Sequence, residues 1–228
     1  MLKIDQVRAG YDEGDVLKGV SFSAMAGEVH GILGVNGSGK TTLFRVLNDW
    51  LSKREGTTTL LNEELKGHHI GFLETDPYFY PYMKGKEYLG LLKMKNEYYD
   101  IDAWNAIFDL PLDQLADEYS TGMKKKLALL GLLAQDRPVL ILDEPLSGVD
   151  IESNVKFQEI ILRLKESGKT ILLSSHMLNA LTTICDKISL LSGGVIKKTY
   201  EKAEFSNLES LITDQIKEGL DQQLDELF

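Results

Sequence analysis

The chain has 228 residues, of which 43% are hydrophobic and 26% are charged, a balance that excludes collagen-like, low-complexity and disordered proteins. Its 25 Lys and Arg residues against 35 Asp and Glu residues give a net charge of −10, which argues against a nucleic-acid partner because phosphate binding needs clustered positive charge. The single cysteine, Cys185, cannot form an internal disulfide, so we expect a packed core thiol in a reducing compartment.

Short apolar strands separated by glycines are predicted at the start of the chain, at 2–7, 17–22 and 28–33. This region carries no apolar segment typical of a signal peptide, so we expect the protein to be cytoplasmic. The densest apolar stretch, 127–134, is too short to cross a hydrocarbon core of about 30 Å. Any work at a membrane is therefore expected to depend on a partner.

Helices and strands alternate further along the chain, which predicts an α/β fold with a mostly parallel sheet. Helical spacing is visible in two segments, 41–51 and 152–167. Apolar strands are predicted at 140–142, 171–174 and 188–191. The alternation also predicts that the helices pack against the faces of this sheet.

Residues 75–136 interrupt the alternation, because they show no convincing strand and contain many aromatic residues. We interpret them as a helical subdomain inserted into a core formed by 1–74 and 137–204, so that 1–228 is one unit. The last stretch, 205–228, predicts an amphipathic helix docked on its own domain, with an oligomer contact as the alternative. Its apolar positions are Leu208, Leu211, Ile212, Ile216, Leu220, Leu224 and Leu227.

A glycine-rich motif lies between the strand at 28–33 and the helix at 41–51. Residues 34–41 match G-x-x-x-x-G-K-[ST], a loop whose backbone N–H groups and following helix N-terminus surround a phosphate. Lys40 should reach the β and γ phosphates, and the Thr41 hydroxyl should ligate Mg²⁺. The predicted nucleotide contacts are Gly34, Val35, Asn36, Gly37, Ser38, Gly39, Lys40, Thr41 and Thr42.

Two carboxylates end the apolar run at 139–142. A buried strand of this kind places Asp143 beside the metal and Glu144 one residue further, where a water can be aligned for in-line attack on a phosphate. On its own, an apolar strand ending in Asp-Glu is often structural. In a chain that also carries a phosphate-binding loop, such a strand predicts nucleotide hydrolysis.

Further motifs in a fixed order resemble those of the ATP-binding cassette (ABC) ATPases, over about residues 1 to 200. The segment 119–123, Tyr-Ser-Thr-Gly-Met, resembles the family signature, and 147–150, Ser-Gly-Val-Asp, resembles the loop after the catalytic carboxylate. Tyr11 matches the adenine-stacking aromatic, Glu74 the loop into the helical subdomain, and His176 the switch histidine. The literal string Leu-Ser-Gly-Gly at 191–194 is instead expected to be a hairpin turn, because it follows His176 between two strands.

Two positions depart from the usual family pattern. Glu74 stands where the family usually has Gln, and Met123 stands where the signature usually ends in Gln. A carboxylate at 74 adds negative charge beside Mg²⁺. The sequence therefore leaves open how strongly the site binds Mg²⁺ and how its activity depends on pH. The pair of departures is similar to the ABC-2 type exporter group.

The resemblance implies a P-loop NTPase (RecA-like) core with an N-terminal antiparallel β layer and an inserted helical subdomain. It implies ATP and Mg²⁺ as ligands, with Thr41, Glu74 and Asp143 around the metal. It also implies Glu144 as the base or water-positioning group, His176 as the γ-phosphate sensor and Asp150 as a dimer-linked residue. The signature residues Ser120, Thr121, Gly122 and Met123 would act in trans on the nucleotide of a second cassette, most simply in a homodimer.

The implied partner is a separately encoded membrane permease, which would hold the protein at the inner face of the cell membrane. The permease would also select the transported substrate, which this sequence does not identify. The aromatic run at 77–82 has two interpretations, packing of the helical subdomain or a groove for a permease helix. The alternative function is a soluble ABC ATPase of repair, translation or cluster assembly. Repair proteins of this family carry a coiled-coil insertion and its translation factors carry two cassettes; neither feature is visible in this sequence, so we expect the transport function.

Overall fold

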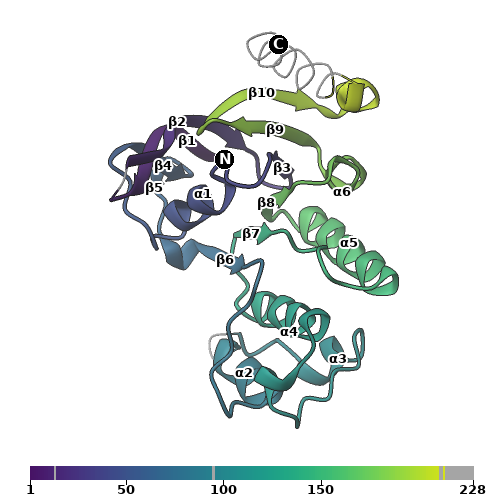
Figure 1. The fold of residues 1–228 in the computed structure, drawn as a ribbon. Helices are drawn as coiled ribbons and strands as arrows, with labels where there is room; N and C mark the ends of the chain where they lie inside the picture. Colours follow the sequence, from purple (N-terminus) through teal and green to yellow (C-terminus); the bar gives the residue numbers. More distant parts are fainter. Residues whose placement is uncertain (13, 94–95, 211–212, 214–228) are drawn as a thin grey trace, which may run out of the picture.

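The computed structural model describes residues 1–12, 14–93, 96–210 and 213. An antiparallel sheet formed by the N-terminal part of the chain lies at one side of the molecule (Figure 1). Its strands, in the order β2-β1-β4-β5, are β2 (Gly14–Ala24), β1 (Leu2–Tyr11), β4 (Glu55–Leu60) and β5 (Glu63–Glu64). The inward positions of β1 and β2 are apolar and buried, so this sheet needs a second layer against that face.

The second sheet has the order β10-β9-β3-β8-β7-β6. All neighbouring pairs from β9 to β6 are parallel, as predicted, and β10 pairs antiparallel with β9. Gly193 and Gly194, with φ of 59° and 81°, form the turn of the β9–β10 hairpin, which confirms the hairpin expected at 191–194. The strands are β3 (Val29–Leu33), β6 (Ile70–Leu73), β7 (Val139–Asp143), β8 (Thr170–Ser175), β9 (Lys187–Ser192) and β10 (Val195–Glu201).

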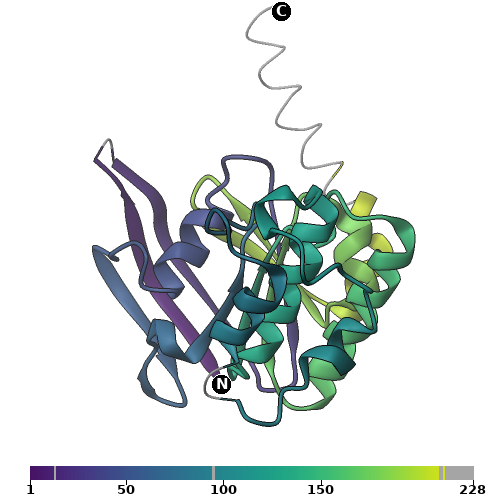
Figure 2. The same ribbon diagram turned by 90° about the horizontal axis from the view of Figure 1, so that it is seen from below.

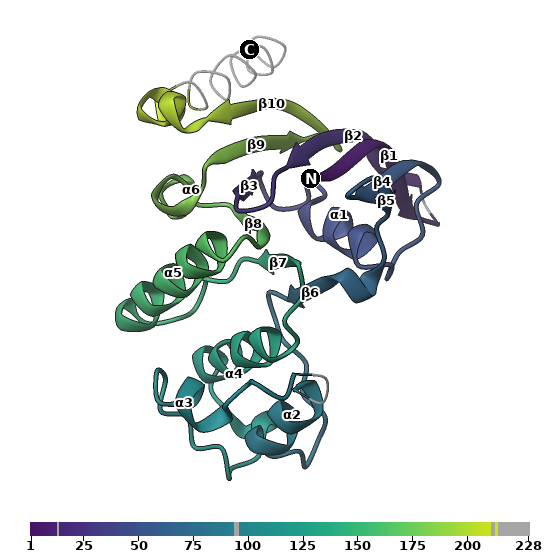
Figure 3. The same ribbon diagram turned by 180° about the vertical axis from the view of Figure 1, so that it is seen from behind.

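Helix α1 (Lys40–Leu47) lies between the two sheets. Its buried face joins apolar side chains of both sheets in one core cluster, which includes Leu43, Phe44, Ile4 and Ile141. Helices α5 (Ile151–Glu166) and α6 (Leu178–Ile184) cover the opposite face of the larger sheet (Figure 3). Seen from below, the N-terminal sheet and these helices lie on opposite sides (Figure 2).

The region 75–136 forms the helical subdomain, which lies at the β6 end of the larger sheet (Figure 1). Among its described residues there is no strand, and one isolated bridge joins Lys84 to Leu115. The phenyl rings of Phe108 in this region and Phe157 in α5 lie 5.6 Å apart, so the subdomain and the core share apolar packing. Its helices are α2 (Gly85–Leu92), α3 (Ile101–Asn105) and α4 (Thr121–Ala134), with a 3₁₀ turn at Ala116–Glu118.

The predicted helix at 41–51 ends earlier than expected, at Leu47. Asp49 adopts a left-handed φ of 58°, and the N–H of Trp50 donates to the carbonyl oxygen of Arg45 at 2.8 Å. These features form a Schellman cap, a helix ending usually built on glycine. Because Asp takes that place here, the sequence shows no clear stop. Trp50 consequently lies beyond the helix and is 56% exposed.

The C-terminal part begins with a 3₁₀ helix at Lys202–Asn207, and Leu208 is fully buried. The other apolar positions of the predicted tail helix, Leu211, Ile212, Ile216, Leu220, Leu224 and Leu227, lie outside the described residues. Cys185 is buried, as predicted. Within the described residues, every helix is too short or too polar to cross a lipid bilayer.

Candidate functional site

The glycine-rich loop joins β3 to the N-terminus of α1. Gly37 and Gly39 have φ of 81° and 109°, values that favour glycine. A Cβ on Gly34 would lie 2.4 Å from the Ser38 hydroxyl and 2.6 Å from the carbonyl oxygen of Leu191, so a larger residue cannot fit without displacing the loop. No side chain caps α1. Its first N–H groups are therefore available to an anion.

Two polar groups of this loop fit a phosphate ligand. The Lys40 ammonium is 7% exposed and donates to the carbonyl oxygen of Gly34 at 2.7 Å. The Ser38 hydroxyl oxygen is buried and has no hydrogen-bond partner among the described residues. Buried hydroxyls are normally paired, so an oxygen-rich anion in the loop would satisfy Ser38. Val35, by contrast, is 69% exposed at the rim.

A carboxylate pair lies at the carboxyl end of β7, beside the start of α1. Asp143 is 1% exposed, its Oδ2 accepts from the Thr41 hydroxyl at 2.8 Å, and its Oδ1 accepts from the Ser174 hydroxyl. The next residue, Glu144, lies 3.9 Å from the Lys40 ammonium through Oε1 and 3.0 Å from Nδ1 of His176 through Oε2. Parallel strands β7 and β8 explain this convergence, because their carboxyl ends meet at one edge.

Glu74 and Tyr11 lie around this cluster and share the neighbour Arg45. Glu74 follows β6, is half-buried, and has a raised pKa because burial disfavours its charge; Arg45 opposes the rise and Asp143 adds to it. Tyr11 is 45% exposed and accepts from the Arg45 guanidinium at 3.1 Å, a hydrogen bond that lowers the pKa of the phenol.

A cavity of about 400 Å³ opens between β2, the glycine-rich loop and the carboxylate pair. Glu74 and Tyr11 do not line it. Three of its features were missed by sequence reasoning: Val16 and Thr75 in the wall, and Ser174 behind the carboxylates. The signal for Ser174 was available, because it is a polar residue at the end of an apolar strand. The lining residues are Val16, Asn36, Gly37, Gly39, Lys40, Thr41, Thr42, Thr75, Asp143 and Glu144.

The described residues include no group of three or more His, Cys, Asp or Glu side chains placed to hold a metal ion. Mg²⁺ is commonly held by one or two carboxylates, with other oxygens coming from water and phosphate. The Thr41 hydroxyl and the Asp143 carboxylate, joined directly, are hard oxygen donors of this type. The donor set therefore fits Mg²⁺ in the company of a phosphate ligand.

The predicted signature segment is located elsewhere, at the N-terminus of α4. Ser120 is the N-cap of this helix, with its hydroxyl accepting from the N–H of Met123 at 3.3 Å. Ser120 and Thr121 are exposed, whereas Met123 packs against the core. None of the residues 120–123 lines the cavity beside the glycine-rich loop. Within one chain, the two parts of the predicted site are not brought together.

Asp150 caps helix α5, close to the same end of α4. Its carboxylate accepts from the N–H of Ser153 at 2.8 Å and from the Ser153 hydroxyl at 2.7 Å, and it lies 3.1 Å from the Lys126 ammonium. The hydrogen bonds from Ser153 and the Lys126 charge hold the pKa of Asp150 well below its ordinary value. Asp150 thus caps a helix of its own chain, and this role does not depend on a second copy.

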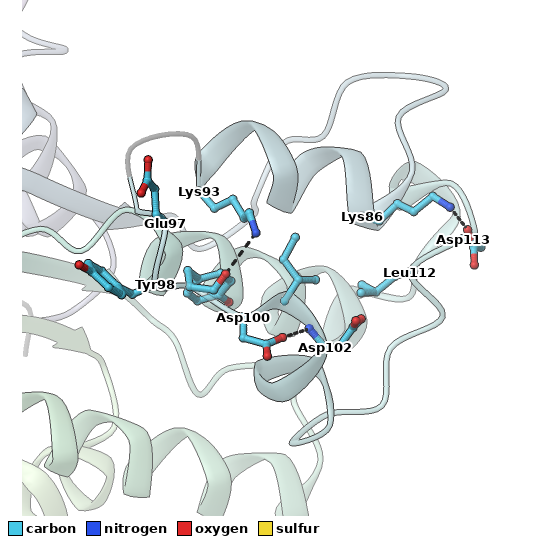
Figure 4. A pocket seen from close by; sticks show the side chains of 10 residues that line it. Lys86, Lys93, Glu97, Tyr98, Asp100, Asp102, Leu112 and Asp113 are labelled. Atoms are coloured by element: carbon cyan, nitrogen blue, oxygen red, sulfur yellow. Dashed lines mark hydrogen bonds and ion pairs between the residues drawn. The ribbon is translucent and has the colours of Figure 1, made fainter.

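A second hollow, of about 560 Å³, lies in the helical subdomain (Figure 4). Its charged groups are engaged locally: Lys86 pairs with Asp113, and Lys93 donates to the carbonyl oxygen of Tyr99 at 3.3 Å. None of the predicted nucleotide contacts lines it. Its chemistry does not match that of the glycine-rich loop.

Comparisons with known proteins agree with this geometry. Residues 17–147 match the ABC transporter family. A Nostoc ABC transporter ATP-binding protein is 37% identical over 195 residues, which cover 78% of this chain and 57% of that protein. The Nod factor export ATP-binding protein I of Ralstonia nicotianae is 30% identical over 85% of this chain and 65% of its own length.

Solved structures give the same result for the fold. The structure of an ATP-binding subunit of an ABC transporter superposes with a TM-score of 0.82 at 25% identity, covering 88% of this chain and 90% of that one. The matched part of this chain spans little more than half the length of its Nostoc relative.

Proposed function

The chain belongs to the ABC transporter family, and on that premise we propose that it binds ATP with Mg²⁺, hydrolyses it, and powers a separately encoded membrane permease. The observation that carries this proposal is the convergence of Lys40, Thr41, Asp143 and Glu144 around one cavity, with His176 in contact with Glu144. These groups supply a phosphate-binding cation, oxygen donors for a metal and a carboxylate for water.

Each part of the cluster has a chemical role in the proposed reaction. The glycine-rich loop and Lys40 would hold the phosphates, with Tyr11 beside the base. Thr41, Asp143 and Glu74 would hold Mg²⁺, which when bound neutralises charge on the phosphate oxygens. Lys40 and the N-terminus of α1 stabilise the negative charge that spreads over the γ-phosphoryl group.

Glu144 is the proposed base. Its carboxylate accepts a proton from a water as the water oxygen bonds to the γ-phosphorus and the bond to the bridging oxygen breaks, releasing ADP and phosphate. The 3.0 Å contact with His176 orients the carboxylate and leaves the other ring nitrogen free to turn toward the γ-phosphate. Because the reaction is mostly positioning, displacement of either side chain should affect rate more than fold.

The exposed signature segment supports a dimer in which each site is shared. Ser120 and Thr121 are exposed, and none of the residues 120–123 lines the cavity beside their own loop; the segment would complete the site of a second copy. A two-fold arrangement uses the same surface on both chains and closes after two. ATP would then lie between 34–41 of one protomer and 120–123 of its partner, with Asp150 close to the junction.

The aromatic run supports a surface for a permease helix. Phe79 is buried and contacts Tyr88 with ring centroids 4.8 Å apart, whereas Tyr78, Tyr80 and Tyr82 are 70%, 65% and 84% exposed. Exposed rings next to Glu74 are suited to receive an apolar helix end and to sense the state of the site. This proposal places the protein at the inner face of the cell membrane, and the Ralstonia relative's name favours an exporter.

The test compares wild-type protein with Lys40→Ala, using Lys86→Gln in the subdomain as the control. ATP with Mg²⁺ should raise the Tm of wild type and of the control but not of Lys40→Ala, because a ligand bound only to the native state stabilises it. Equal shifts in all three would remove Lys40 from the site. Isolation from detergent-solubilised membranes should also yield a polytopic protein; ribosomes or DNA in its place would favour the soluble ABC ATPase.

A further inference from the structure

Lys125, close to the N-terminus of α4, is a buried lysine. It is 2% exposed, and its ammonium donates to the carbonyl oxygens of Glu144 and Ser147 at 2.8 and 2.5 Å. Taking an ammonium out of water is unfavourable unless it is paired or hydrogen-bonded. A lysine that only served helix stability would remain at the surface. Its burial therefore points to a role at the two carbonyl groups that it joins.

The turn held by Lys125 contains the proposed base. Glu144 has a φ of 50°, in the left-handed region that a non-glycine residue adopts at an energetic cost. Its N–H donates to the Ser174 hydroxyl at 3.0 Å, and its carbonyl oxygen accepts from Lys125. The peptide groups on both sides of Glu144 are thus held by side chains from other elements. This strained backbone directs the carboxylate toward His176 and Lys40.

The same turn of α4 also holds the far end of this loop. Lys126, the next residue, forms the 3.1 Å ion pair with Asp150. The loop 144–150 is therefore attached at both ends to the helix that begins with the signature segment at 120–123. A shift of the N-terminus of α4 would pull on the carbonyl groups of Glu144 and Ser147, each through one hydrogen bond from Lys125.

We propose that Lys125 is a positioning residue for Glu144, and that it links the signature segment of a chain to the base of that chain's own site. The proposal rests on the proposed function, since it assumes that Glu144 acts in ATP hydrolysis. Engagement of 120–123 with a second copy's nucleotide would then set the backbone of Glu144. Lys125 itself contacts no nucleotide in this arrangement.

The first test is steady-state ATP hydrolysis by Lys125→Met, which keeps the chain length and removes all donors. We expect kcat to fall about 10- to 100-fold, as for a base displaced by about 1 Å, while KM for ATP changes less than about twofold. Lys125→Arg, which keeps the charge and the donors, should recover part of the rate. Lys86→Gln, whose lysine pairs with Asp113 at the subdomain surface, should match wild type.

A double variant separates positioning from general loss of structure. If Lys125 acts through Glu144, adding Lys125→Met to Glu144→Gln should slow hydrolysis no further than Glu144→Gln alone. A multiplicative loss, a parallel loss of ATP binding, or a wild-type kcat in Lys125→Met would overturn the proposal. If Lys125→Met does not fold, Lys125→Gln replaces it, because the shorter amide side chain cannot reach both carbonyl oxygens. The same changes in kcat and KM are expected for Lys125→Gln. Wild-type protein without ATPase activity would instead overturn the proposed function.

Discussion

The proposed catalytic cluster of the core and the predicted signature segment of the subdomain are built in opposite ways. In the core, Thr41, Asp143 and Ser174 form a chain of hydrogen bonds with a nearly fully buried carboxylate at its centre. In the subdomain, Ser120 and Thr121 are exposed and the Ser120 hydroxyl bonds only to its own helix among the described contacts. The core cluster is complete once the chain has folded, whereas the signature segment keeps exposed polar groups that are accessible to a partner.

This difference separates what one chain can do from what two chains do together. In the proposed function, the loop at 34–41 and the carboxylates would bind nucleotide within one chain, because every element that positions them belongs to that chain. In the same proposal, the segment at 120–123 would take part in binding only when a second copy is present. Variants in the two regions should therefore fail at different steps.

The largest effect is expected from Glu144→Gln in the core. Removal of the proposed base should slow hydrolysis about 10²- to 10⁴-fold, while the thermal shift with ATP and Mg²⁺ persists because Lys40 and the loop are intact. Gel filtration with ATP should show a trapped dimer that wild type forms only transiently. Wild-type turnover in purified Glu144→Gln protein would contradict the assignment of this carboxylate.

A second prediction concerns the apolar contact between the two regions. Phe157 is fully buried and its ring lies 5.6 Å from that of Phe108. Phe157→Ala should lower the free energy of unfolding by about 3–5 kcal/mol, because it leaves a cavity at the junction. Urea denaturation measures this loss. Separate unfolding transitions of the core and the subdomain in the wild-type protein would contradict this prediction, because they would show that the packing around Phe108 and Phe157 does not couple the two regions.

The smallest effect is expected at Asp150, in the loop between the regions. Its pKa is held below the ordinary aspartate value of 3.8, so its charged form stabilises the fold above that pH and the contribution is lost as the pH falls below it. Asp150→Asn should therefore lower the Tm at pH 7, and the difference from wild type should shrink in acid. Glu166→Gln, at the other end of α5, should not reproduce this pH dependence; a difference that stays constant with pH would count against the charge.

The order of motifs along the chain was enough to predict the parallel sheet and the inserted helices. These predictions succeeded because the spacing of glycines and the runs of apolar residues are visible within short segments of the sequence. They missed the end of α1, where Asp49 replaces the usual glycine of the cap, and the strand β4, whose Glu, Gly and Thr residues carry little apolar signal.

The sequence motifs named residues that the structure brings together at one cavity, but not the hydrogen bonds between elements that hold them there. Arg45 could be linked to Tyr11 only in the structure, which places α1 beside that residue, and the hydrogen bond from Ser174 to Asp143 is likewise visible only there. The contact of Lys125 with two carbonyl groups was also invisible, because an isolated run of three lysines at 124–126 predicts a solvated face. Side chains that act on backbone atoms across elements leave no spacing pattern in one sequence.

The most direct measurement of the central claim, that the site is completed in trans, mixes two inactive variants. Lys40→Ala removes the phosphate cation, and Gly122→Asp places a negative charge in the signature; a Cβ at Gly122 would lie 3.5 Å from the nearest atom, the carbonyl oxygen of Gly148, so the fold has room for it. A mixed dimer holds one intact loop facing one intact signature, so an equal mixture should recover up to about a quarter of wild-type ATPase activity. A mixture no more active than the average of its separate components would contradict the account.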